Sequence, residues 1–134
     1  MSSVYLSFKF SGEKAEALES MLSGIKFSLN RAGHDVFCSF WLDDYFKRSC
    51  MSQDQVYDFC VDKIKGLDVF MPFVISPEPS KGMFLESDRA VELNKRYVLL
   101  IRPELKFSGL RSSADKIIEY SSLPELYERL AKFR

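Results

Sequence analysis

Residues 80–90 hold the side chains of this chain whose types and spacing could do chemistry. The segment reads Ser-Lys-Gly-Met-Phe-Leu-Glu-Ser-Asp-Arg-Ala. We expect a strand-to-helix loop that carries Ser80 and Gly82, followed by a helix with Glu86 in its first turn. The helix dipole favours an ionised carboxylate at that place. An ionised and positioned carboxylate can attack an electron-poor carbon, as in glycosidases.

The elements around this segment decide whether its side chains can form a site. Residues 68–75 are almost continuously apolar, which predicts a central strand buried on both faces. A helix is expected over residues 82–94. Ligands of open α/β sheets bind outside the carboxyl ends of the strands, and Ser80, Gly82 and Glu86 follow such an end. If the segment has no catalytic function, Ser80 and Gly82 belong to a simple turn and Glu86 only complements the helix dipole.

Short apolar runs alternate with helical periodicity along the rest of the chain. Further strands are predicted at residues 4–8, 35–38, 97–101 and 116–120. Further helices are predicted between Gly12 and Gly33, from a capping box at Ser52 to Gly66, and over residues 123–133. This alternation predicts an α/β fold, a flavodoxin-like three-layer sandwich with a five-stranded parallel sheet in the order 2-1-3-4-5. We expect residues 1–134 to form a single domain.

Composition argues against several classes of function. Lys and Arg number 19 and Asp and Glu also 19, without a basic patch, so no nucleic acid polymer or membrane surface is expected as a partner. No apolar run approaches the roughly 20 residues of a membrane span. The three cysteines lack metal-ligand spacing and, with no signal peptide in view, are expected as reduced thiols of a cytoplasmic protein. The single histidine, His34, is expected at the surface, and we predict no metal and no cofactor.

Two blocks of the chain resemble the nucleoside 2-deoxyribosyltransferase superfamily, which includes deoxynucleoside 5′-monophosphate N-glycosidases. The resemblance covers residues 4–102. The first block is the opening strand Val4-Tyr5-Leu6-Ser7. The second is a serine-glycine-glutamate signature behind an Asp-bearing apolar strand, carried here by Leu67, Asp68, Val69, Ser80, Gly82, Glu86, Ala90 and Lys95.

The resemblance implies a role for each matching residue. Glu86 is the nucleophile that attacks the anomeric carbon of a nucleoside, and Tyr5 lies beside it and steadies it. Ser80 and Gly82 bind the 5′ side of the sugar, as a hydroxyl or a phosphate. Ser7 and Phe8, at the end of the opening strand, contact the substrate. The resemblance also implies a homodimer in which a partner subunit completes each pocket.

The chain departs from the family pattern at two places. Phe8 and Lys9 stand where a Gly-Pro or Gly-Ser turn is usual. Cys60 stands where an Asp usually serves as acid and base, and Asp58 and Asp62 each lie about 160° around a helix from that position. A thiol on an apolar helix face has a raised pKa and replaces a carboxyl group poorly, so we expect weak or narrow activity. Cys60 can equally be a small core residue.

An aromatic segment at residues 39–51 is expected as a loop or short helix over the site. Trp41 is a candidate for stacking on a nucleobase, and it could instead pack under the loop or at a dimer interface. Asp43 and Asp44 are candidates for a substitute acid.

Three functions follow as hypotheses. The first is cleavage or transfer of the N-glycosidic bond of a nucleoside or nucleoside 5′-monophosphate. The second is a TIR-like domain that cleaves NAD or binds proteins. The third is a non-catalytic nucleotide-binding homologue.

Overall fold

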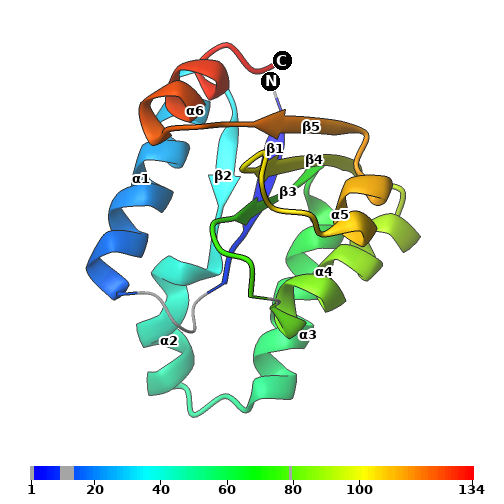
Figure 1. Ribbon diagram of the computed structural model, residues 1–134. Coiled ribbons are helices and arrows are strands. Elements are labelled where there is room, and N and C mark those ends of the chain that lie inside the picture. The colour runs from blue at the N-terminus through cyan, green and yellow to red at the C-terminus, as the bar shows by residue number, and fades with distance from the viewer. Residues whose placement is uncertain (1, 10–13, 79) are drawn as a thin grey trace.

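The computed structural model describes residues 2–9, 14–78 and 80–134, and its centre is a parallel sheet (Figure 1). Five strands form it in the order β2-β1-β3-β4-β5. The strands are β1 (Ser3–Ser7), β2 (Asp35–Phe37), β3 (Val69–Val74), β4 (Arg96–Ile101) and β5 (Lys116–Glu119). The predicted strands, their order and the flavodoxin-like α/β arrangement are therefore confirmed.

Helices fill the connections between the strands. They are α1 (Ala15–Arg31), α2 (Asp43–Arg48), α3 (Gln53–Gly66), α4 (Lys81–Glu92), α5 (Ser108–Ser113) and α6 (Leu123–Leu130). A 3-10 turn over Ser39–Leu42 precedes α2, so the aromatic segment is helical for most of its length. The helix α5 was not assigned from the sequence. Gly12, where we expected the first helix to begin, lies outside the described residues.

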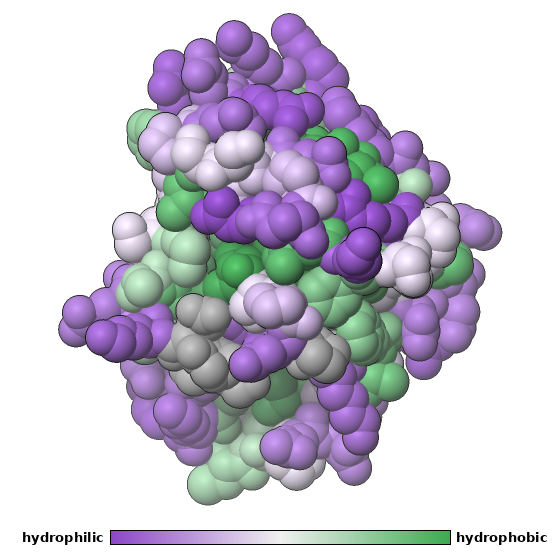
Figure 2. Space-filling view, viewed as in Figure 1, coloured by the Kyte–Doolittle hydropathy of each residue, from purple (hydrophilic) through white to green (hydrophobic). Residues whose placement is uncertain are grey.

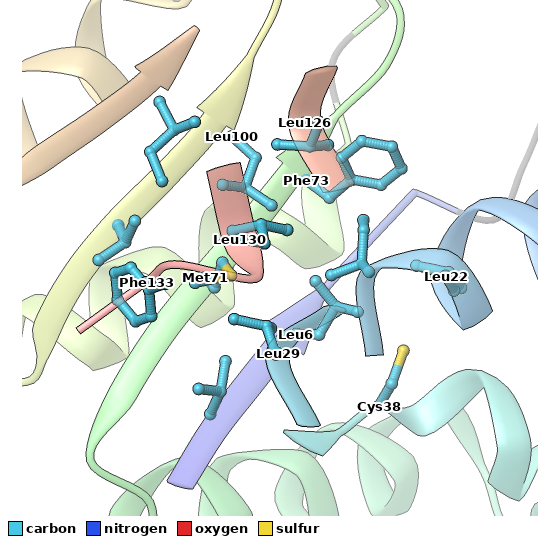
Figure 3. Packing of buried hydrophobic residues seen from close by; sticks show 14 of the residues in the cluster. Leu6, Leu22, Leu29, Cys38, Met71, Phe73, Leu100, Leu126, Leu130 and Phe133 are labelled. Atoms are coloured by element: carbon cyan, nitrogen blue, oxygen red, sulfur yellow. The ribbon is translucent and has the colours of Figure 1, made fainter. Parts of the chain in front are cut away.

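The helices cover the two faces of the sheet and form two separate apolar cores. Helices α1 and α6 lie on one face and α3, α4 and α5 on the other (Figure 1). Figure 3 shows the first core, where Leu22 and Leu29 of α1 meet Leu126 and Leu130 of α6. The second core includes Tyr5, Cys60 and Met83 and borders the predicted site. Figure 2 shows apolar residues in the middle of one molecular face, inside a mostly hydrophilic rim.

The central strand β3 is buried along its whole length, as its apolar sequence predicts. Pro72 stands within it, although proline cannot donate to a ladder and is rare in central strands. Pro72 lies opposite Ser7 of β1. The register between β3 and β4 pairs Phe70 with Tyr97 and resumes at Phe73, so the proline falls in an interruption of that ladder. The sheet therefore tolerates a proline two residues before β3 ends.

Helix caps fix the two helices that border the predicted site. At the start of α3, the Ser52 side chain accepts from the Gln55 amide and the Gln55 side chain accepts from the Ser52 amide. The predicted capping box is therefore confirmed. At the start of α4, Ser80 Oγ accepts from the Met83 amide at 3.2 Å.

The expectation that His34 lies at the surface is wrong. His34 is 4% exposed, and its ring bridges the two ends of the chain. Nδ1 accepts from the Ser2 amide at 3.1 Å, and Nε2 lies 2.7 Å from the Phe133 carbonyl oxygen. The helix-to-strand turn leads directly into the edge strand β2, where the C-terminal segment covers it. The histidine is therefore a structural residue that satisfies buried backbone groups.

Among the described residues, no helix is both long enough and apolar enough to cross a membrane.

Candidate active site

Two hydroxyl groups of β1 hold the carboxylate of Glu86. Tyr5 and Ser7 are two residues apart on the strand, so their side chains point to the same face of the sheet, the face that α4 covers. The Tyr5 hydroxyl donates to Glu86 Oε2, and the Ser7 hydroxyl donates to Oε1 at 2.7 Å. The predicted proximity of Tyr5 and Glu86 is therefore confirmed, and each carboxylate oxygen has a protein donor.

The position of Glu86 within its helix differs from the expectation. Ser80 caps α4 and the helix begins at Lys81, one residue earlier than expected. Glu86 is therefore the sixth helical residue and lies in the second turn. The effect of the helix dipole falls off within the first turn, so the hydrogen bonds from Tyr5 and Ser7 are the main support for an ionised Glu86.

Burial and hydrogen bonding act on Glu86 in opposite directions. Burial raises the pKa of the Glu86 carboxyl group, while the hydrogen bonds from Tyr5 and Ser7 lower it and leave a net rise. Burial and the neighbouring carboxylate also raise the pKa of Tyr5. The phenol therefore keeps its proton and stays a donor to Glu86, and ionisation of the Glu86 carboxyl group costs folding free energy.

Glu86 lies in the wall of a cavity of about 570 Å³ between α2, α3 and α4. That volume is within the range of sites for small organic ligands. Phe8, Phe46, Met51, Val56 and Met83 provide apolar wall, and the polar lining residues are Ser7, Ser39, Asp43, Lys47, Gln53, Tyr57, Cys60 and Glu86. Apolar walls with a few polar groups beside one buried carboxylate are typical of a ligand site.

Cys60 lies in the same cavity wall as Glu86. Its residue is 4% exposed, and Ser7 and Ser39 line the same wall. Burial raises the pKa of the thiol, as expected for a cysteine on an apolar helix face. Cys60 is therefore a neutral thiol at neutral pH, and it belongs both to the core of α3 and to the cavity.

The structure brings some of the other predicted residues to the cavity. Phe8 and Gly82 line it. Ser80 faces a smaller neighbouring cavity that shares Met83 as a wall. Trp41 does not line the cavity of Glu86. Its indole is 39% exposed, carries Lys26 Nζ at 5.0 Å from the ring centroid, and borders a separate hollow with Ala15 and Phe40.

The candidate substitute acids are also separated. Asp43 lines the cavity and pairs with Lys47, with Asp43 Oδ2 at 2.9 Å from Lys47 Nζ. Asp44 borders the hollow beside Trp41 instead. Asp62 is exposed and faces Lys65 at 3.8 Å. Of the three aspartates, only Asp43 is in place to meet a ligand of Glu86.

Sequence reasoning missed the face that α3 presents to the cavity. Gln53, Val56, Tyr57 and Cys60 share this face, at the spacing of i, i+3, i+4 and i+7. Gln53 lies about 10 Å along the helix axis from Cys60. The mixture of polar and apolar residues at helical spacing was a usable signal, although only its apolar members were assigned.

The smaller cavity beside Ser80 contains a buried cation. Lys9 Nζ lies 2.8 Å from Glu78 Oε2, and its side chain is 9% exposed whereas that of Glu78 is 73% exposed. Ser76 lines the same cavity, and its buried hydroxyl has no hydrogen-bond partner among the described residues. The free volume of this cavity is only about 10 Å³.

No group of three or more His, Cys, Asp or Glu side chains within the described ranges could hold a metal ion.

Comparison with solved structures finds the same fold in several proteins. A CMP N-glycosidase from Clostridium botulinum superposes with a TM-score of 0.72 at 23% identity, covering 98% of this chain and 99% of that one. A 2-deoxyribosyltransferase from Bacillus psychrosaccharolyticus gives a TM-score of 0.68 at 18% identity, covering 93% and 90%. A conserved protein from Enterococcus faecalis gives a TM-score of 0.65 at 11% identity, covering 97% of each chain.

These similarities, all below 25% identity, show that this chain has the same fold as those proteins. No protein-family model matches the sequence, and no curated protein matches it either.

The opposing effects of burial and hydrogen bonding on the pKa of Glu86 can be tested by measuring folding stability against pH. Because the pKa of Glu86 is raised in the folded protein, its ionisation favours unfolding as pH rises above the ordinary glutamate value of about 4.3. Glu86→Gln keeps the shape and removes the charge, so we expect a higher melting temperature at pH 7. The gain should shrink to nothing below pH 4, where both variants are neutral.

Differential scanning calorimetry from pH 3 to 8 measures this effect. The matched control is Glu128→Gln on the exposed face of α6. Its melting temperature should match that of the wild type at every pH. A Glu86→Gln variant that is less stable than the wild type at pH 7 would contradict our account of the buried charge.

Proposed function

We propose that this protein cleaves or transfers the N-glycosidic bond of a nucleoside 5′-monophosphate, with Glu86 as the nucleophile. The observation that carries the proposal is the Glu86 carboxylate in the wall of the 570 Å³ cavity, with one hydroxyl donor on each oxygen. Such fixed donors aim the carboxylate at one point in the cavity. The similar CMP N-glycosidase and 2-deoxyribosyltransferase support this class of chemistry.

The proposed reaction proceeds in two displacements. A carboxylate oxygen of Glu86 attacks the anomeric carbon while the bond from that carbon to the base breaks, and the electron pair of that bond leaves with the base nitrogen. The resulting glycosyl ester is then attacked by water or by a second base. The Tyr5 and Ser7 hydroxyl groups donate hydrogen bonds to the carboxylate before the attack. They donate to it again after the ester is cleaved.

The cavity offers a place for the base on the side of α2 and α3. Phe8, Phe46 and Val56 supply apolar wall for a planar ring, and Gln53 and Tyr57 supply hydrogen-bonding groups near the rim. In this arrangement Phe8 takes the base-facing role that we first considered for Trp41, whose indole borders another hollow.

The opposite side of Glu86 suits an anionic 5′ group. Gly82 lines the large cavity there, and Ser80 lines the small one with Lys9 and Ser76. Among the described residues, the buried Lys9 ammonium group is paired with the exposed Glu78 carboxylate, and it can exchange such a partner for a phosphate. The orphaned Ser76 hydroxyl supplies a further donor. This cluster favours a nucleoside 5′-monophosphate over a nucleoside.

The homodimer and the cytoplasmic location stay predictions.

The function is tested by assaying the wild type with a panel of ribo- and deoxyribonucleoside 5′-monophosphates, the matching nucleosides, and NAD. We expect release of the free base from a nucleotide, and loss of that release by at least about 10³-fold in Glu86→Gln, because the nucleophile is gone. Base release is followed by liquid chromatography.

Glu128→Gln, with the same change on an exposed surface, is the control. Release of nicotinamide from NAD with no cleavage of nucleotides would favour the TIR-like alternative. Nucleotide binding in calorimetry without any turnover would favour the non-catalytic alternative.

The cluster of Lys9, Ser76 and Ser80 predicts that the enzyme prefers a nucleoside 5′-monophosphate to the matching nucleoside. Lys9→Met keeps the buried apolar stem and removes the charge, so kcat/KM for the nucleotide should fall roughly 10- to 100-fold. The value for the matching nucleoside should stay the same. Lys132→Met on the surface is the control, and equal losses for nucleotide and nucleoside would contradict a phosphate contact.

A thiol such as Cys60 is a poor acid for protonating the departing base. We therefore expect the reaction rate to depend strongly on how readily the base leaves. General acid help is worth roughly 10²–10⁴-fold, and the Asp43 carboxyl group is held by Lys47. We therefore expect N7-methyl-2′-deoxyguanosine 5′-monophosphate, whose base departs as a neutral molecule, to react roughly 10²–10⁴-fold faster than the unmethylated nucleotide. Single-turnover rates measure the ratio. Equal rates would show that a residue of the cavity protonates the base, and Asp43→Asn would then be examined first.

A further inference from the structure

The ion pair between Lys9 and Glu78 is unequal in its exposure to water. Lys9 Nζ lies 2.8 Å from Glu78 Oε2, and the side chain of Lys9 is 9% exposed whereas that of Glu78 is 73% exposed. Among the described residues that line the small cavity, these two are the only charged ones. An ammonium group taken out of water is costly without an anion beside it, so Lys9 depends on the pair far more than Glu78 does.

The exposed partner of this pair is the one that can leave. A carboxylate that turns away from Lys9 is hydrated at once, because most of the Glu78 side chain lies in water, so hydration offsets its loss of the pair. The enclosed ammonium group stays behind and needs another anion. Lys9 also lowers the pKa of the Glu78 carboxyl group by hydrogen bonding and by its charge, so Glu78 is itself an anion at neutral pH.

Two hydroxyl groups of the same cavity have protons to offer an incoming anion. The buried Ser76 hydroxyl has no hydrogen-bond partner in the part of the chain that the structure describes. The Ser80 hydroxyl oxygen accepts from the Met83 amide at 3.2 Å, which leaves its own proton for another acceptor. A phosphate group has more acceptor oxygens than a carboxylate and can meet an ammonium group and two hydroxyl groups together.

The size of the small cavity makes the Glu78 carboxylate and a phosphate group alternatives. The free volume of about 10 Å³ is about the room that one water molecule needs. A phosphate group therefore reaches Lys9 only after a side chain of the wall moves away. Glu78 is exposed and would repel the phosphate by its like charge, and both properties single it out as the side chain that leaves.

We infer that Glu78 is a built-in competitor of the ligand anion, which holds Lys9 before a ligand binds and gives way to the 5′-phosphate of the substrate. The pair sets a threshold for binding, because a ligand has to offer Lys9 a better anion than Glu78. A nucleoside, whose 5′-hydroxyl is neutral, leaves the pair intact. Glu78 is thus a specificity-determining residue, and the inference rests on the proposed function because the anion belongs to the same substrate.

The test is the affinity for inorganic phosphate at pH 7 and constant ionic strength, measured by NMR of backbone amide groups with Ser76 and Ser80 as reporters. Glu78→Gln keeps the shape of the side chain and removes the competing charge. Its dissociation constant for phosphate should be roughly 10- to 100-fold lower than that of the wild type, the effect of one charge-assisted hydrogen bond. Lys9→Met should abolish the binding, and Glu78→Gln added to Lys9→Met should restore none of it.

Glu92→Gln is the matched control for the loss of one negative charge. Glu92 is also an exposed carboxylate in an ion pair, with Oε2 at 3.0 Å from Arg89 Nη1, and the side chain of that arginine is 40% exposed. This variant should bind phosphate as the wild type does.

Melting temperatures give a second measurement, which needs no turnover. In phosphate-free buffer Glu78→Gln leaves the buried ammonium group without a counter-charge, so this variant should melt below the wild type. Added phosphate supplies the missing anion and should raise the melting temperature of Glu78→Gln more than that of the wild type. A Glu78 that only stabilised the fold would lower the melting temperature without making phosphate bind more tightly.

Titrations with a nucleoside 5′-monophosphate and the matching nucleoside show whether the anion belongs to the substrate. The gain in Glu78→Gln should appear as a lower KM for the nucleotide with kcat nearly unchanged, or as a lower Kd if the nucleotide is not turned over. The nucleoside should show no gain. A gain for inorganic phosphate alone would overturn the assignment of the anion to the substrate.

Two further results would overturn the inference, whether or not turnover is found. One is a Glu78→Gln protein that binds inorganic phosphate no more tightly than the wild type, or no binding to either protein. The other is an equal gain in Glu92→Gln, because the effect would then follow from net charge. Absence of turnover in the wild type, together with tighter binding of phosphate and nucleotide in Glu78→Gln, would overturn the proposed function and leave the role of Glu78 standing.

Discussion

The hydrogen bonds from Tyr5 and Ser7 to Glu86 are the interaction on which the candidate site depends. A buried carboxylate is costly unless donors meet its oxygens, and both donors come from one strand. The order of the sheet makes this possible, because β1 lies directly beside β3, and α4 follows β3 over the same face. The two partners are 81 and 79 residues from Glu86 in sequence, and the parallel topology brings them to one edge of the sheet.

The same burial that makes Glu86 costly makes it useful. An exposed carboxylate would be solvated and mobile, whereas a carboxylate held by Tyr5 and Ser7 is oriented before a ligand arrives. Tyr5 belongs to the second core, where it packs with buried residues such as Cys60 and Met83. The cavity beside Glu86 has apolar walls, and the buried ammonium group of Lys9 lies in the neighbouring smaller cavity.

The sequence predicted what periodicity and chain order control, and it failed where the outcome depends on packing at longer range. The five strands and their order followed from alternating patterns and from the rule for parallel sheets, whereas the resemblance implied the proximity of Tyr5 to Glu86. The helix of Glu86 began one residue early because Ser80 is its cap. Trp41 and His34 were misplaced for another reason, since a 3-10 turn and the C-terminal segment, both remote from any local pattern, decide where these rings lie.

The central claim is that Glu86 attacks the anomeric carbon and forms a covalent intermediate. The most direct measurement is the anomeric configuration of the product when a β-nucleoside 5′-monophosphate reacts in the presence of methanol, read by proton NMR. Two displacements through Glu86 predict retention, so the methyl glycoside should be β. An α product would mean that the acceptor attacks the sugar directly, and it would contradict the assignment of Glu86 as nucleophile.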